Sequence, residues 1–362
     1  MKIINVVGAR PNFMKIAPLM AAYAAWPQVT PMLVHTGQHY DQQMSQLFFR
    51  QLGIPEPDLN LGIGSGTAVA QTAEIMRAFE PVVRDQAPVA VLVVGDVNST
   101  LACGLVAVKL GVPLVHVEAG LRSFDRTMPE EVNRVLTDAV SDLLFCTEQS
   151  GVDNLAHEGV SDQKVFLVGN VMVDTLLKNR QKAEASTILE DLSLCPQGYA
   201  VLTLHRPSNV DDPLVLGRLL DAIDVVQRDR PVVFPVHPRT RRQLSDSTMS
   251  RRIAAQTNLK LIDPAGYLDF LKLIAHASCV LTDSGGIQEE TTILKVPCLT
   301  LRDNTERPVT VDIGSNRLVG TDPGRIVAAY RDVLAGSCEA GVPPLWDGHA
   351  AERIVGILRA QL

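Results

Sequence analysis

The segment VLTDSGGIQEE at residues 280–290 predicts a strand, a tight turn and the start of a helix. Residues 279–282 are apolar and partly β-branched, as in a buried parallel strand. The Ser-Gly-Gly triplet at 284–286 is typical of a turn, and we expect its glycines to allow positive φ and a close backbone approach. From Ile287 the apolar residues take helical spacing. Backbone N–H groups at the helix start should therefore face the carboxyl end of the strand.

A helix that begins directly after a strand favours a bound anion, because its free N–H groups and its dipole both attract negative charge. We expect a diphosphate at this position. Glu290 lies about one turn into the helix, where it can accept hydrogen bonds from a ribose. The alternative interpretation is that Gly285 and Gly286 only close the turn between strand and helix. This motif alone does not decide between the two.

Strands and helices alternate along the whole chain, with short turns between them. This order predicts a doubly wound parallel sheet, and a second such pattern begins near Tyr199. The predicted strands are residues 3–7, 32–35, 89–94, 114–117, 143–146, 165–168, 199–204, 232–236, 259–262, 279–282 and 296–301. The longer predicted helices include residues 67–83, 214–227, 267–275 and 348–361. Because 362 residues exceed one ordinary core, we expect two domains that face each other across a cleft.

Charged residues follow several of the strands. Arg10, Asp96 and Glu118 each come at the end of a predicted strand, where doubly wound sheets bind their ligands. Lys15 lies on the first turn or so of the helix that Pro11 opens. The helix dipole disfavours cations at that place, so an anion site explains Arg10 and Lys15 better than two surface cations do.

Three acids and one histidine are candidates for proton transfer. Asp96, Glu118, Glu130 and His205 can all exchange protons near neutral pH in a suitable environment. Each of these residues except Glu118 also has a purely structural interpretation, and Glu118 is harder to explain as a helix cap. Asp96 could cap the following helix, Glu130 could be a favourable first-turn acid, and His205 could be a buried structural histidine.

Composition excludes several other classes. Hydrophobic residues make up 46% and charged residues 20%, and the net charge of -7 argues against a nucleic-acid-binding protein. No apolar run is long enough to span a membrane. The six cysteines form no C-x-x-C pair, which favours reduced thiols in a cytosolic protein over disulfides or zinc. The sequence has no H-E-x-x-H motif, no clustered Cys/His spacing and no Asp-rich calcium loop, so we expect no metal. The glycines at 62–66 follow no strand suitable for a dinucleotide-binding motif, so we expect no NAD.

Six motifs occur together and in order: GARP at 8–11, GD at 95–96, HVEAGLR at 116–122, PEEVNR at 129–134, DSGGIQEE at 283–290 and RDNTERP at 302–308. As a set covering nearly the whole chain, they resemble the non-hydrolysing UDP-N-acetylglucosamine 2-epimerases. The resemblance implies a cytoplasmic homodimer without metal or NAD. It implies interconversion of UDP-N-acetylglucosamine and UDP-N-acetylmannosamine for surface polysaccharides, through elimination of UDP to 2-acetamidoglucal and its re-addition.

The resemblance also implies a glycosyltransferase-B-like fold of two Rossmann-like domains. We expect residues 1–169 to carry the acids and residues 170–347 to bind UDP, with a helix at about 348–362 packing back on the first domain. By motif, the implied catalytic residues are Asp96, Glu118, Glu130 and His205. The implied ligand contacts are Arg10, Lys15, Phe270, Ser284, Gly285, Gly286, Glu290 and Arg307.

Two stretches depart from the pattern of many bacterial members. Residues 38–44 read QHYDQQM, where those members carry part of an allosteric substrate site, so we expect weak or absent substrate allostery. Residues 205–208 read HRPS in place of His-Arg-Arg-Glu. The Tyr40-Asp41 pair resembles relatives that act on UDP-diacetamido-uronic acids. Those relatives tend to lack the TERP form that this chain has at 305–308, so such a sugar ranks second as a substrate, after UDP-N-acetylglucosamine. A glycosyltransferase and a non-catalytic UDP-sugar-binding protein are the rivals from other classes.

Overall fold

The computed structural model describes residues 1–37, 49–64, 66–336 and 340–362, apart from the side chains of Arg10 and Ser247. Internal contacts divide the chain into two units. Unit 1 comprises Met1–Lys178 and Pro344–Leu362, and unit 2 comprises Asn179–Pro343. This division falls within helix α7 (Val171–Ala183), after Lys178. The domain boundary at Gly169 that we expect from the sequence stays a prediction. The segment at 38–44 on which we based the allostery prediction lies outside the described residues.

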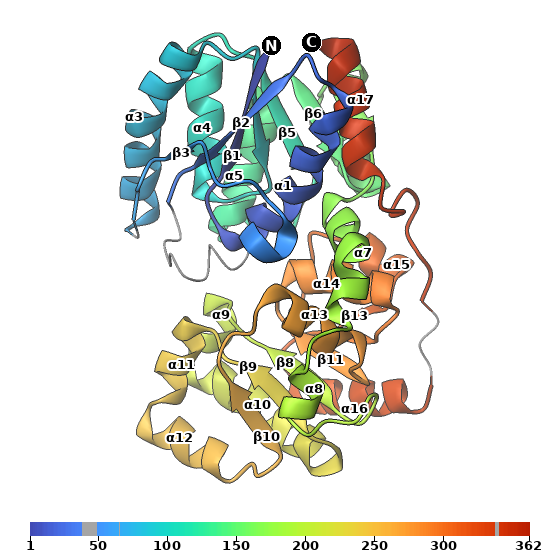
Figure 1. Ribbon diagram of the computed structural model, residues 1–362. Coiled ribbons are helices and arrows are strands. Elements are labelled where there is room, and N and C mark those ends of the chain that lie inside the picture. The colour runs from blue at the N-terminus through green and yellow to red at the C-terminus, as the bar shows by residue number, and fades with distance from the viewer. Residues whose placement is uncertain (38–48, 65, 337–339) are drawn as a thin grey trace. The chain divides into compact units, whose positions relative to one another are not determined.

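Unit 1 is built on a parallel sheet in the order β3-β2-β1-β4-β5-β6-β7 (Figure 1). Its strands are β1 (Lys2–Val7), β2 (Thr30–His35), β3 (Leu59–Asn60), β4 (Ala90–Val94), β5 (Leu114–Ala119), β6 (Leu143–Cys146) and β7 (Val165–Leu167). Its helices are α1 (Arg10–Ala22), α3 (Ala68–Gln86), α4 (Asn98–Lys109), α5 (Pro129–Val140), α6 (Gln149–His157), α7 (Val171–Ala183) and α17 (Ala350–Gln361), with 3-10 turns at Tyr23–Ala25 and Asp162–Lys164. Strands that are apolar on both faces are what a sheet covered by helices on both sides requires.

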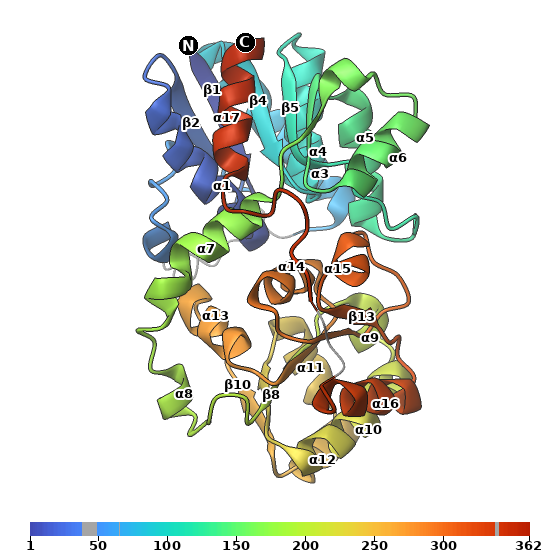
Figure 2. The ribbon, with the colours of Figure 1, turned by 90° about the vertical axis from the view of Figure 1, so that its right-hand side faces the viewer.

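Helices α3, α4 and α5 pack side by side, while α1 packs against α17. One face of the sheet buries Ile4, Val6 and Val91 against Ile75 and Phe79 of α3. Figure 2 shows α1 and α17 together over the sheet of unit 1, although they are far apart in sequence. The indole Nε1 of Trp346 donates to the Thr147 carbonyl at 2.9 Å and fixes the segment that leads into α17.

Unit 2 repeats this architecture with a parallel sheet in the order β10-β9-β8-β11-β12-β13 (Figure 1). Its strands are β8 (Ala200–Thr203), β9 (Val232–Pro235), β10 (Leu259–Ile262), β11 (Cys279–Thr282), β12 (Cys298–Thr300) and β13 (Asn316–Leu318). Its helices are α8 (Ile188–Asp191), α9 (Pro207–Val210), α10 (Pro213–Asp229), α11 (Pro238–Leu244), α12 (Ser247–Ala254), α13 (Tyr267–Ala275), α14 (Gly285–Leu294), α15 (Val309–Asp312) and α16 (Pro323–Leu334). The prediction of two doubly wound parallel α/β units is confirmed.

Each sheet has one place where the chain reverses its direction of winding. In unit 1 the strands run outward from β1 to β3, and the chain then returns to β4, which pairs with β1 through Ile3 and Ala90. In unit 2 the same reversal lies between β8 and β11, which pair through Val201 and Val280. Connections leave the two central strands toward opposite sides there, which opens a crevice at the carboxyl edge of a doubly wound sheet.

Candidate functional site

The predicted site residues gather at these two reversal points. In unit 1 the stretch from Gly8 to Lys15 follows β1, and Gly95 and Asp96 follow β4. In unit 2 His205 follows β8, and Ser284 follows β11. Since this position in a doubly wound sheet is the ordinary place for a ligand, each unit carries part of the predicted set where a ligand would bind.

Lys15 and Glu118 form a buried ion pair in unit 1, between Nζ and Oε2. Both residues are only 5% exposed. Gly95 lies directly beneath the pair, because a Cβ at that position would be 2.7 Å from Lys15 Nζ. A side chain at residue 95 would displace the cation, so the close approach requires glycine, and its φ of +67° suits glycine as well.

Glu118 lies inside β5 and not after it, which corrects the predicted end of that strand at Val117. The register of β5 against β6 shifts between Val117 and Ala119, and Glu118 takes a φ of +75°. A non-glycine residue in this region is strained by about 1–2 kcal/mol. The bulge aims the carboxylate at Lys15, one residue before the end of a strand whose other residues are buried.

Asp96 accepts a hydrogen bond from Arg134 Nη2 on α5 at 2.7 Å. The same guanidinium holds Glu131 at 2.6 Å through Nη1. Glu131 in turn accepts from the backbone N–H groups of Ser123 at 3.0 Å and Phe124 at 2.8 Å. Glu130, the predicted catalytic acid of this helix, is exposed in the first turn, whereas its neighbour Glu131 is 2% exposed.

His116 and Asp138 form a second buried layer behind the Gly95 turn. Asp138 Oδ1 lies 2.6 Å from His116 Nδ1, and Nε2 lies 2.8 Å from the carbonyl oxygen of Gly95. Burial alone would raise the pKa of Asp138, but the charge and hydrogen bond of His116, together with Arg122, lower it. The His116 ring therefore links the Asp138 carboxylate to the Gly95 carbonyl, and it supports the turn on which Asp96 lies.

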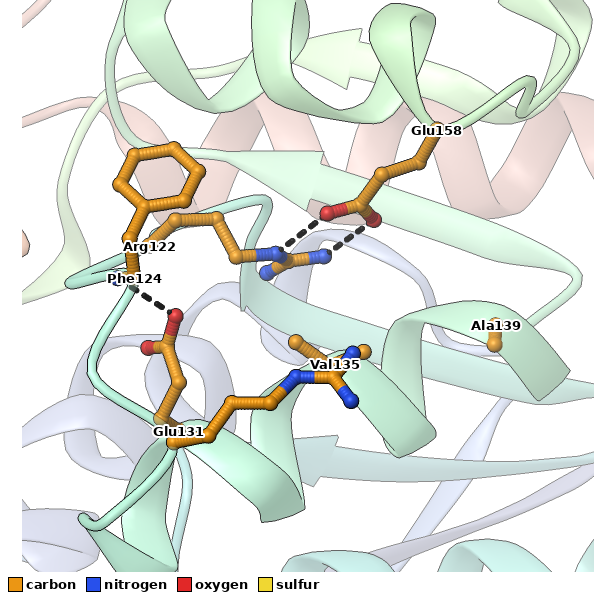
Figure 3. A pocket seen from close by; sticks show the side chains of 7 residues that line it. Arg122, Phe124, Glu131, Val135, Ala139 and Glu158 are labelled. Atoms are coloured by element: carbon orange, nitrogen blue, oxygen red, sulfur yellow. Dashed lines mark hydrogen bonds and ion pairs between the residues drawn. The ribbon is translucent and has the colours of Figure 1, made fainter.

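A cavity of about 420 Å³ lies beside this network in unit 1. Its lining is Arg122, Phe124, Arg126, Glu131, Val135, Ala139 and Glu158. Figure 3 shows Arg122 held by both oxygens of Glu158, and Glu131 bonded to the backbone of Phe124. The acidic groups of this lining are thus engaged with the protein itself, and neither Asp96 nor Glu118 belongs to it.

The turn after β11 differs from the one predicted. Gly285 is the first residue of α14, and the N-cap is Ser284 with a φ of −88°. Neither glycine of the turn is among the residues with positive φ. The glycine is needed at 285 for space, because an added Cβ would collide with Arg307 Nη1 and would lie 2.6 Å from Glu306 Oε1. The backbone at Gly285 therefore makes the predicted close approach, and the group that it approaches is the Arg307–Glu306 ion pair of the protein itself.

Arg307 is buried behind the glycine turn and is held by two carboxylates. Its Nε donates to Glu289 Oε1 and its Nη1 to Glu306 Oε1, both at 2.5 Å. The sequence predicted Arg307 as a direct ligand contact, and this double pairing gives it the further task of fixing the start of α14. Glu290 is 5% exposed one turn into that helix, and burial, with the nearby charge of Glu289, raises its pKa to about 8.

His205 is held by Asp283, the last residue before the glycine turn. His205 Nδ1 lies 2.7 Å from Asp283 Oδ1, and the side chain of His205 is 42% exposed. Phe270 lies half-buried on α13, which packs against α14. Four residues that hold the candidate site residues or the turns beside them were not among those predicted: Asp283, Glu131, Arg134 and Asp138. The signal was available for Asp283, since a carboxylate directly after an apolar strand is costly unless it is paired.

Within the described ranges, no three His, Cys, Asp or Glu side chains lie close enough together to hold a metal ion. Every helix in the same ranges is too short or too polar to cross a membrane.

Comparisons with known proteins agree over the full length. The family model of UDP-N-acetylglucosamine 2-epimerase matches residues 21–359. The UDP-N-acetylglucosamine 2-epimerase of Methanocaldococcus jannaschii is 41% identical, and the alignment covers 99% of each chain. The UDP-2,3-diacetamido-2,3-dideoxy-D-glucuronate 2-epimerase of Pseudomonas aeruginosa is 42% identical, again over 99% of each.

A solved structure matches the fold closely. It is the M. jannaschii UDP-GlcNAc 2-epimerase in complex with UDP-GlcNAc and UDP, with a TM-score of 0.93 over 99% of this chain and 100% of that one. The predicted glycosyltransferase-B-like fold class is thereby confirmed. With the family model matching nearly the whole chain, this protein belongs to the UDP-N-acetylglucosamine 2-epimerase family.

Proposed function

We propose that this protein interconverts UDP-N-acetylglucosamine and UDP-N-acetylmannosamine by inverting C2. The observation that carries the proposal is the buried Lys15–Glu118 pair at the reversal point of unit 1, with Asp96 beside it on the next strand end. A bulged, strained strand residue that presents a carboxylate there is typical of a functional site. Kinship over the full length with a M. jannaschii UDP-N-acetylglucosamine 2-epimerase supports the same substrate.

The reaction we propose is an elimination followed by an addition. The C2 proton is barely acidic, so cleavage of the C1–O bond runs ahead of its removal. The electron pair of that bond leaves with the β-phosphate oxygen of UDP, and the C2 proton passes to an enzyme base, which gives UDP and 2-acetamidoglucal. Re-addition of UDP at C1, with a proton delivered to the other face of C2, yields the epimer. Inversion therefore needs proton-transfer groups on both faces of the sugar.

The proposed roles divide between the two units. Asp96, Glu118 and Glu130 of unit 1, with His205 of unit 2, are the groups we assign to proton transfer and to stabilising positive charge at C1. The start of α14 at Ser284, Gly285 and Gly286 would hold the diphosphate with its N–H groups. Arg10, Lys15 and Arg307 would balance its charge, Glu290 would bind the ribose, and Phe270 would lie against the uracil.

We further propose a cytoplasmic homodimer that needs neither metal nor NAD and that supplies surface polysaccharide synthesis. The elimination itself supports the absence of a redox cofactor, because no atom changes its net oxidation state between substrate and product. The intermediate must also be kept from water and from escape, which a closing site would achieve.

Incubation with UDP-N-acetylglucosamine in D2O tests the proposal. We expect the manno isomer to form and deuterium to enter C2 of both isomers, read by proton NMR. Transfer of the sugar to an acceptor would identify a glycosyltransferase instead. Binding of the substrate without exchange at C2 would identify a non-catalytic binding protein.

A UDP-2,3-diacetamido-uronic acid is the second candidate substrate. It is favoured by the 42% identity with the P. aeruginosa enzyme named for that sugar. A tenfold or greater preference for the uronic acid in kcat/KM would replace UDP-N-acetylglucosamine in the proposal, while the chemistry at C2 would stay the same.

A further inference from the structure

Asp283 is a fully buried carboxylate that is surrounded by donors from one short segment. It is 0% exposed at the end of β11. Its oxygens accept from the backbone N–H of His205 at 3.0 Å and of Arg206 at 3.0 Å, and from Asn209 Nδ2 at 3.3 Å. The backbone donors come from the residues just after β8, the neighbouring strand, and Asn209 lies in the short helix α9 that follows them. One side chain thus fixes the loop that carries the proposed proton-transfer histidine.

The ring of His205 completes this set. Its Nδ1 lies 2.7 Å from Asp283 Oδ1. Burial alone would raise the pKa of Asp283, but the charge and hydrogen bond of His205, with the two backbone N–H groups, lower it. The carboxylate is therefore ionised and can only accept, so Nδ1 must carry a proton.

We infer that Asp283 is a positioning residue that fixes the Nδ1–H tautomer of His205 and leaves Nε2 as the nitrogen that exchanges protons. A carboxylate on one ring nitrogen commonly sets which of the two is protonated and how the ring points. The side chain of His205 is 42% exposed, which leaves its outer edge accessible. The ring of His237 has its centroid 6.0 Å away. This inference rests on the proposed function for its kinetic part alone.

The same residue links two predicted tasks. The backbone carbonyl of Asp283 accepts from Arg206 Nε at 3.0 Å, and Ser284 next to it is the N-cap of α14. The side chain orients His205, while the main chain enters the turn proposed to hold the diphosphate. Placement of the leaving group and placement of the imidazole are therefore set by one position in the chain.

Asp283→Asn is the decisive variant because it keeps the shape and changes the donor pattern. If the amide oxygen stays on the backbone N–H groups of His205 and Arg206, the amide NH2 faces Nδ1. The ring must then present a lone pair at Nδ1 and carry its proton on Nε2. In the alternative orientation the NH2 would face two backbone donors, which loses both hydrogen bonds.

Nitrogen-15 NMR of the histidine rings tests the tautomer without any turnover. His205→Gln identifies the signals of His205 among the eight histidines. We expect neutral His205 to have a protonated Nδ1 and a bare Nε2 in the wild type, with the pattern reversed in Asp283→Asn. The same pattern in both proteins, or a wild type protonated on Nε2, would overturn the inference.

Kinetics then separate positioning from folding. We expect Asp283→Asn to lower kcat by about 10²-fold or more, with UDP affinity by calorimetry nearly unchanged. In a His205→Gln background the same change should cost almost nothing further, because the two residues act as one unit. Equal losses in both backgrounds, or a loss of UDP affinity as large as that of kcat, would assign Asp283 to the fold or to the glycine turn and would overturn the inference.

Asn209→Ala is the matched control. It removes one donor to Asp283 Oδ2 and leaves the pairing of Oδ1 with His205 Nδ1 in place. We expect an unchanged tautomer and a kcat within about tenfold of wild type; a reversed tautomer in this variant would contradict the inference. If the wild type forms no manno isomer, the proposed function fails, and the NMR experiment still decides the role of Asp283.

Discussion

Lys15 Nζ and Glu118 Oε2 form an ion pair in which both side chains are less than a tenth exposed. Breaking such a pair from one side leaves a buried charge, which costs about 3–5 kcal/mol. We expect Lys15→Met to lower the free energy of unfolding by about that amount in urea titrations. Adding Glu118→Gln should recover most of the loss, because both charges are then gone.

The exposed Glu74–Arg77 pair on α3 is the control for this prediction. Its side chains are 50% and 79% exposed, so Arg77→Met should cost less than about 1 kcal/mol. If the free energy of unfolding of the Lys15 and Glu118 double variant fell by the sum of the two single decreases, the pair would not stabilise unit 1.

Glu118→Gln should separate binding from turnover. The amide keeps the size of the carboxylate but cannot take a proton at neutral pH. We expect UDP to bind with nearly normal affinity while kcat falls by orders of magnitude, measured by exchange of deuterium into C2. Near-normal turnover would remove Glu118 from the catalytic set. Glu130→Gln and Glu131→Gln, compared in the same assay, would show which acid at the start of α5 takes part.

Gly285→Ala should disturb the ion pairs behind the glycine turn. The new Cβ would collide with Arg307 and lie 2.6 Å from Glu306 Oε1, and overpacking of this kind costs about 1–3 kcal/mol. We expect a lower melting temperature and weaker UDP binding. Gly356→Ala in α17 is the control, because its Cβ meets nothing within 4 Å and alanine favours a helix. That variant should melt at the wild-type temperature or above it.

The elevated pKa of Glu290 predicts how stability changes with pH. Burial, with the charge of Glu289, raises that pKa from 4.5 to about 8, so the folded protein binds a proton that the unfolded chain releases. Stability from this group is complete below pH 4.5 and is lost as the pH rises through 8. We expect Glu290→Gln to melt higher than wild type at pH 9 and almost equally at pH 5.

Differential scanning calorimetry across that range checks the prediction. Glu190→Gln on α8 is the control, since its side chain is exposed. A difference between Glu290→Gln and wild type that stayed constant with pH would contradict the assignment to Glu290.

The departure of residues 38–44 from the pattern of many bacterial members predicts kinetics without substrate allostery. We expect a hyperbolic dependence of rate on substrate concentration, and turnover of UDP-N-acetylmannosamine without added UDP-N-acetylglucosamine. Sigmoidal rate curves would contradict this prediction and would indicate an allosteric substrate site. A reverse reaction that starts only after UDP-N-acetylglucosamine is added would do the same.

Several element positions followed from the sequence where an apolar run ended at a turn. Leu259–Ile262, Tyr267–Ala275 and Cys279–Thr282 have the predicted bounds, because strand and helix periods differ clearly there. The directions in which side chains point could not be predicted from the sequence. Glu130 and Glu131 are adjacent in one helix, and only the packing of α5 decides that Glu131 is buried and Glu130 exposed.

Pairings between distant residues were also beyond the sequence. His205 and Asp283 are 78 residues apart and meet because β8 and β11 are neighbours in the sheet. The glycine turn shows a related limit. Gly285 was expected to allow both a positive φ and a close approach; its φ is not positive, and no local pattern reveals that the group it approaches is Arg307.

The chain enters unit 2 at Asn179 and returns to unit 1 at Pro344, so unit 2 is an insertion in unit 1. During synthesis the ribosome delivers all of unit 2 before it delivers α17, which packs against α1. Domains generally fold as they emerge, so unit 2 can complete its core while unit 1 still lacks its last helix. Nascent chains that end at Pro343 and are extended by a linker long enough to clear the ribosomal exit tunnel should therefore resist proteolysis in unit 2 while the α1 side of unit 1 remains open to cleavage.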